Sequence, residues 1–92
     1  MPSAEPILQE KFTMDDGYIV QMKVWQVPTA VRGSKHRFKY SLFFGKEGKR
    51  IIAYDNEAGK GDHRHYEDLE LAYTFTTKDK LLDDFIEAWL RR

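Results

Sequence analysis

The sequence contains no cysteine, and its charges cancel, with 15 basic residues against 15 acidic ones. The absence of cysteine excludes disulfides, thiolate metal sites and a cysteine nucleophile. Zero net charge argues against a protein that coats nucleic acid through its overall charge. No apolar run approaches the roughly 20 residues of a membrane helix. The start, MPSAEPILQEKF, also lacks the basic and apolar regions of a secretory signal. We therefore expect a soluble, cytoplasmic protein with no membrane partner.

The length of the chain fits one domain. It has 92 residues, of which 41% are apolar and 14% aromatic, enough to build one hydrophobic core but not two. We predict a single domain over residues 1–92, with residues 1–6 as a loose lead-in.

The charges are nonetheless unevenly distributed along the chain. Residues 32–50 hold seven bases against one acid, a net charge of +6, whereas the segments on both sides are acidic. A basic patch can bind RNA or an acidic partner even on a neutral protein, because the local potential steers the ligand. The alternative interpretation is a solvated outer strand face.

Alternation of apolar and polar residues predicts several strands. The predicted strands are Ile7–Thr13, Tyr18–Val27, His36–Phe44, Lys49–Asp55 and Leu69–Phe75. Residues 56–62 are rich in glycine and predict a loop.

Near the C-terminus the apolar spacing becomes helical. The apolar residues there are Leu81, Leu82, Phe85, Ile86 and Trp89. Thr76 or Thr77 can cap this helix, and Asp79 completes a capping box with Thr76. The predicted fold class is α+β: an antiparallel sheet of five or six strands with one C-terminal helix packed on one face.

The segment Tyr54–Tyr66 carries the residues best suited to chemistry. His63 and His65 are two apart, so in an extended segment their rings lie on the same side. Two such imidazoles can serve as general acid and base. They can also bind a metal ion, with Asp55 or Asp62 as third ligand. A purely structural role, in which the rings hydrogen-bond locally, is the third interpretation.

Other residues of the segment suit an anion. Lys60 lies between two glycines, where a turn can aim backbone N–H groups and the ammonium at one anionic oxygen. Arg64 points away from the two histidines if the extended segment is regular. Tyr54 could stack on a base, although aromatic residues at strand ends usually belong to the core.

The order of motifs resembles the TumE-type toxin family of bacterial toxin–antitoxin modules. The matching pieces are Asp15-Asp16-Gly17, the strand to Trp25 and Pro28, His36-Arg37-Phe38-Lys39-Tyr40, the long motif from Tyr54 to His65, Tyr73-Thr74-Phe75 and Leu81-Leu82-Asp83-Asp84-Phe85. The resemblance implies a neighbouring antitoxin, typically a helix-turn-helix protein. Relatives commonly have a glycine-bearing turn after the histidines, which is missing from Tyr66-Glu67-Asp68 here.

Together these observations predict a toxin that acts on RNA, with RNA or the ribosome as a partner. His63 and His65 would open onto solvent and cleave or bind RNA without a cofactor, Asp55 orienting a ring and Lys60 holding the phosphate. The predicted RNA contacts are Arg64, Lys39, Arg37 and Tyr54. Two alternatives stay open: a non-catalytic protein-binding module, and a metal-dependent hydrolase using His63, His65 and a carboxylate such as Asp62. A homodimer through a strand edge is a further expectation.

Overall fold

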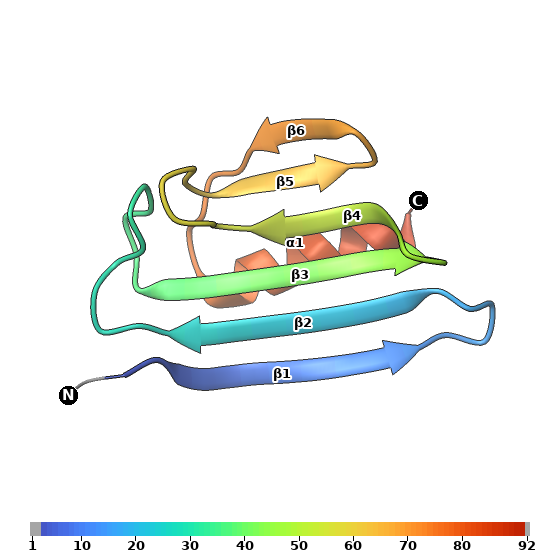
Figure 1. Ribbon diagram of the computed structural model, residues 1–92, viewed down its shortest axis with the longest axis horizontal. Helices are drawn as coiled ribbons and strands as arrows, with labels where there is room; N and C mark the ends of the chain where they lie inside the picture. The colour runs from blue at the N-terminus through green and yellow to red at the C-terminus, as the bar shows by residue number, and fades with distance from the viewer. Residues whose placement is uncertain (1–2, 92) are drawn as a thin grey trace.

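The computed structural model describes residues 3–91 as one antiparallel sheet with a single helix behind it (Figure 1). The strands are β1 (Glu5–Thr13), β2 (Ile19–Gln26), β3 (Phe38–Lys46), β4 (Lys49–Asp55), β5 (His63–Tyr66) and β6 (Leu69–Ala72). The helix α1 (Lys78–Leu90) follows them. The predicted α+β class is confirmed, with six strands.

The sheet is a meander, because its strand order β1-β2-β3-β4-β5-β6 is the order of the sequence. Every neighbouring pair is antiparallel. β1 and β6 are therefore the two edges. The register of β4 on β5 matters most for function, because it sets Asp55 opposite His63 and Ala53 opposite His65.

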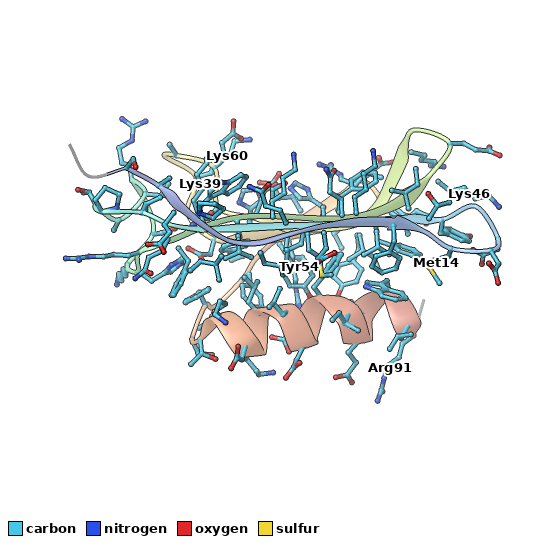
Figure 2. The ribbon with its side chains drawn as sticks, turned by 90° about the horizontal axis from the view of Figure 1, so that it is seen from below. Met14, Lys39, Lys46, Tyr54, Lys60 and Arg91 are labelled. Atoms are coloured by element: carbon cyan, nitrogen blue, oxygen red, sulfur yellow. The ribbon has the colours of Figure 1, made fainter. Side chains whose placement is uncertain are left out.

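The helix covers one face of the sheet, over β3 and β4 (Figure 2). Its cap is Thr77, whose hydroxyl accepts from the N–H of Lys80 at 3.1 Å, so the predicted capping box of Thr76 with Asp79 is wrong. The buried side chains of α1 are Leu81, Phe85 and Trp89. They pack on the sheet residues Val20, Val24, Tyr40, Leu42, Phe44, Ile52 and Tyr54. This core accounts for the helical apolar spacing read from the sequence.

The two faces of the sheet differ because side chains alternate along each strand. Residues that point toward α1 form the helix-covered face, where Tyr54 lies (Figure 2). The opposite side is called the helix-free face from here on. Lys39 and Lys60 lie on it (Figure 2), and the register places Asp55, His63 and His65 on it as well.

Several strand boundaries differ from prediction, most clearly in the two edge strands. β1 begins at Glu5, so Glu5 and Pro6 are not part of a loose lead-in; residues 1 and 2 of that predicted segment lie outside the described residues. Pro6 is tolerated because β1 is an edge strand with an irregular register between Pro6 and Leu8. β6 ends at Ala72 rather than Phe75, because Phe75 leaves the sheet and stacks on His36, with ring centroids 3.6 Å apart.

The turn between β5 and β6 forms without glycine. Glu67 takes the left-handed conformation, with φ of 55°, that a glycine would adopt at lower cost. Its N–H donates to the carbonyl of Ile51 at 2.7 Å, which helps to hold this strained residue. The hairpin that follows the two histidines is therefore preserved.

Candidate functional site

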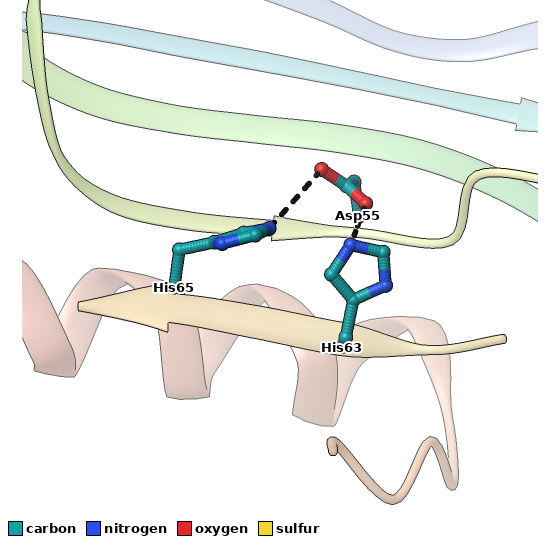
Figure 3. A group of neighbouring side chains, drawn as sticks. All are labelled: Asp55, His63 and His65. Carbon is teal, nitrogen blue, oxygen red and sulfur yellow. Dashed lines mark ion pairs between the residues drawn. The ribbon is translucent and has the colours of Figure 1, made fainter. Parts of the chain in front are cut away.

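Asp55, His63 and His65 gather on the helix-free face (Figure 3). Asp55 is the last residue of β4, and the two histidines come from the adjacent strand β5. Antiparallel pairing sets Asp55 directly across from His63, and alternation puts His65 on the same side. Each residue offers one possible metal-ligand atom, a ring nitrogen or a carboxylate oxygen, and these three atoms lie within 4.8 Å of one another. The two-residue spacing thus brings both rings to one place, as predicted.

The orientation of both rings is well defined. Their Nε2 atoms approach the Asp55 carboxylate, His63 at 2.6 Å from Oδ1 and His65 at 4.0 Å from Oδ2 (Figure 3). Their Nδ1 atoms face acceptors behind them, the carbonyl of Gly61 at 3.0 Å from His63 and Glu70 Oε2 at 3.7 Å from His65. Both rings are therefore directed at one carboxylate, and a hydrogen bond to the main chain orients His63 from behind.

The short contact between His63 and Asp55 is a close approach and not an aligned hydrogen bond. Oδ1 of Asp55 is buried and accepts no hydrogen bond of ordinary geometry from any residue between 3 and 91. A buried acceptor in this state is unusual and needs a physical explanation. The cluster of Asp55, His63 and His65 therefore contains a carboxylate oxygen without a hydrogen bond from the described residues, although its interatomic distances are short.

The rings do not open onto solvent as expected. His63 is 5% exposed and His65 is 6% exposed, and they pack edge to face with centroids 4.9 Å apart. The Asp55 side chain is 29% exposed and forms the accessible side of the cluster. Burial, helped by the positive charge of Arg50, lowers the pKa of His65 below its ordinary value. Both effects favour the neutral form of the His65 ring.

A second polar group holds the loop that joins Asp55 to His63. Asp62 Oδ1 accepts from Ser34 at 2.5 Å, and its Oδ2 accepts from Tyr40 at 2.8 Å and lies 2.7 Å from His36 Nε2. Asn56, at the other end of the loop, accepts from the N–H of Tyr40 at 2.9 Å. Because Asn56 follows Asp55 and Asp62 precedes His63, this Asp62 group positions the cluster from both ends.

Asp62 consequently does not join the two histidines, which corrects the predicted metal set of His63, His65 and Asp62. The carboxylate that meets them is Asp55. His36, to which sequence reasoning gave no role, is the residue that pairs with Asp62. Their separation of 26 positions left no local signal in the sequence.

Lysines on the helix-free face lie next to the cluster. A pocket of about 290 Å³ is lined by Lys23, Lys39, Ser41 and Asp55, among others. Lys39 is exposed, as is Arg37 just before β3. Lys60 lies on this side too (Figure 2), but its ammonium is 3.7 Å from Glu57 rather than at the cluster. Lys23 is an addition that sequence reasoning missed; its place across from Ser41 follows from the register.

Arg64 and Tyr54 lie on the helix-covered face of the sheet. They therefore cannot contact RNA bound beside the two histidines, and this part of the prediction is wrong. Tyr54 is 1% exposed and belongs to the core, where its ring cannot stack on a base. Arg64 points away from the histidines, as regular alternation requires. It lines a groove of about 960 Å³ between β4, β5 and α1, together with Tyr66 and Asp84.

Comparison with known proteins identifies the family. The model of the family described as Toxin TumE matches residues 3–92, which is nearly the whole chain. The chain therefore belongs to the TumE toxin family, and a toxin of this kind implies an antitoxin as partner. No curated protein and no solved structure matches it significantly. Within the described residues, no helix is long and apolar enough to cross a membrane.

Proposed function

We propose that this toxin acts on RNA, that the helix-free face is its RNA-binding surface, and that Asp55, His63 and His65 carry the chemistry. The observation that supports this most directly is the convergence of these three side chains beside Lys23 and Lys39 on one face. The proposed setting is the cytoplasm, with a helix-turn-helix antitoxin as the neutralising partner.

The residue types suit phosphodiester cleavage. That reaction needs a group that removes a proton from the nucleophile and positive charge near the phosphate. A neutral imidazole such as His65 can accept a proton, and a carboxylate such as Asp55 can orient a ring or bind a cation. The site thus contains the chemical groups the reaction needs, within one cluster.

The lysines supply the binding half of the proposal. Lys23 and Lys39 come from neighbouring strands and border the same pocket as Asp55, so a phosphate held there lies next to the cluster. Phosphate contacts of this kind release counterions, and binding weakens as salt rises. Lys60 adds positive charge on the same face (Figure 2), although its ammonium pairs with Glu57, and Arg37 is exposed just before β3.

The test is growth arrest and RNA cleavage by the His63→Ala and His65→Ala variants. Loss of a general acid or base costs about 10²–10⁴-fold in rate, so we expect both variants to lose toxicity and cleavage. Lys78→Gln, at the start of α1 on the other side of the molecule, serves as the control and should stay toxic. If both histidine variants remain fully toxic and fold normally, the proposed site is wrong.

The second candidate is a non-catalytic binding module, which the edge strand β1 favours. Almost all of β1 is exposed, including Ile7 at 41% and Phe12 at 43%. Such an edge can add a strand from a partner or from a second copy of the chain. A wild-type protein that binds its antitoxin and stops growth, yet cleaves no RNA with or without added metal, would favour this candidate.

A further inference from the structure

We infer that Asp55, His63 and His65 form a binding site for one divalent transition-metal ion. The inference concerns the same cluster as the proposed function and rests on it. In the inferred site, the two imidazoles act as ligands of the ion. Metal binding itself does not require RNA to be the substrate, so the two statements can be tested separately.

The orientation of the rings is the first argument. Metal-binding histidines usually coordinate through one nitrogen, while the other donates to a carbonyl or carboxylate behind the ring. His63 has this arrangement, with Nδ1 at 3.0 Å from the carbonyl of Gly61 and Nε2 facing Asp55. His65 also directs Nε2 at Asp55, and its Nδ1 lies 3.7 Å from Glu70 Oε2, which is beyond hydrogen-bond distance. Both rings are nearly buried, and each directs its Nε2 at the Asp55 carboxylate.

The unsatisfied oxygen is the second argument. Oδ1 of Asp55 is buried, lies 2.6 Å from His63 Nε2 and yet accepts no aligned hydrogen bond from the described part of the chain. A cation bound to both atoms, once the contact opens to ligand spacing, would satisfy the unsatisfied oxygen and the nitrogen together. The Asp62 carboxylate is the contrasting case, since hydroxyl donors occupy both of its oxygens.

The distances allow an ion after a small adjustment. Bonds of about 2.0–2.2 Å to nitrogen and oxygen place tetrahedral ligand atoms about 3.4 Å apart. The contact of 2.6 Å must therefore open, and the wider separations of up to 4.8 Å must close. Rotation of Asp55 can lengthen its contact with His63, because this side chain is the partly exposed member of the cluster. Closing the wider separations requires a shift of the two rings as well.

The ligand set indicates the class of ion. Two imidazoles and one carboxylate suit Zn²⁺, Co²⁺, Ni²⁺ or Cu²⁺, whereas Mg²⁺ and Ca²⁺ prefer oxygen ligands alone. Three protein ligands leave a coordination position open, as in catalytic rather than structural zinc sites. That open position would lie on the side of Asp55, where the pocket with Lys23 and Lys39 begins.

The experiment uses the full chain without a histidine tag, stripped with chelator and then titrated with Co²⁺ and Zn²⁺. We expect one ion per chain, a visible Co²⁺ absorption of the tetrahedral or five-coordinate kind, and a higher unfolding temperature with Zn²⁺. Asp55→Asn and His63→Gln should lose the absorption. Glu70→Gln, which changes only the group behind His65, should weaken binding roughly 10–100-fold.

A matched control is available. Glu57→Gln removes an exposed carboxylate two residues from Asp55 and should keep the ion. The inference is overturned if wild type binds neither ion above background, or if the Asp55→Asn variant binds as tightly as wild type. RNA cleavage that survives full chelation would also overturn a metal-dependent reaction while leaving the proposed function intact. Tight metal binding by a toxin that cleaves no RNA would support the metal site and overturn RNA cleavage as the proposed function.

Discussion

Two histidine–aspartate groups lie at the two ends of the same loop, and they differ in how completely their polar atoms are satisfied. At the end of the loop, Asp62 accepts hydrogen bonds from Ser34 and Tyr40 and pairs with His36, whose ring also stacks on Phe75. At the start of the loop, Asp55 approaches His63 and His65, but its Oδ1 atom accepts no hydrogen bond from residues 3–91. The same residue types thus form a saturated group and an unsaturated one.

The difference separates support from reactivity. A largely buried carboxylate with hydrogen bonds to both of its oxygens contributes to stability and has little left to offer a ligand. An unsaturated carboxylate beside two imidazoles contributes little to stability but retains affinity for a proton, a cation or a substrate group. The loop between Asn56 and Asp62 connects the two, so that the first group fixes the position of the second.

The largest expected effect comes from breaking the saturated group. Asp62→Ala leaves three partly buried donors, on Ser34, His36 and Tyr40, without their acceptor, and should lower the free energy of unfolding by about 3–5 kcal/mol. Urea unfolding at pH 7 measures it. A loss below about 1 kcal/mol would show that Asp62 does not anchor the loop. Asp62→Asn, which keeps one acceptor oxygen, should lose less than Asp62→Ala.

The next effect comes from Asn56, which links the same group to β3. Its side chain accepts from the N–H of Tyr40 at 2.9 Å and donates to the carbonyl of Phe38 at 2.7 Å, and it is 1% exposed. Asn56→Ala should therefore cost about 2–3 kcal/mol, since each buried backbone partner is left unsatisfied. Asn56→Asp is the informative companion, because it keeps the acceptor but not the donor. Equal stability of both variants and wild type would contradict the assignment.

Sequence reasoning predicted most elements of the fold, because those elements carry a local signal, but it named no strand at β5. Alternation of period two located β2, β3 and β4, and the helical spacing from Leu81 to Trp89 located α1. The residue opposite each side chain depends on register, which no local signal sets. His63 and His65 were found because their own spacing brings them together, whereas the pairing of His36 with Asp62 was missed.

The burial of the candidate site also could not be predicted from the sequence. Two polar residues in a glycine-flanked strand suggest exposure, and the rings are instead covered by each other and by their neighbours on β4 and β6. Likewise, the composition of the segment Tyr54–Tyr66 suggested one cluster of charges. Strand alternation divides that segment between two faces, which removes Arg64 and Tyr54 from the site.

A smaller effect on stability is expected from the unsaturated group. Asp55→Asn removes a carboxylate that accepts no aligned hydrogen bond, so the metal-free protein should change by no more than about 1 kcal/mol in unfolding free energy. Activity and metal binding should nevertheless be lost. Urea unfolding in the presence of chelator is the measurement. A loss as large as that of Asp62→Ala would make Asp55 a structural residue and would remove the contrast between the two groups.

The smallest effect is a pH dependence that arises from His65 in the metal-free protein. Because burial lowers its pKa in the folded state, the unfolded chain takes up a proton first as the pH falls below the ordinary value of about 6.5. The unfolded state then binds more protons, so the free energy of unfolding falls with pH until the folded-state pKa is reached. Above pH 6.5 the contribution is complete and constant. Urea midpoints at pH 7.5 and 5.5 should therefore differ more for wild type than for His65→Gln, and equal differences would mean that the ring titrates alike in both states.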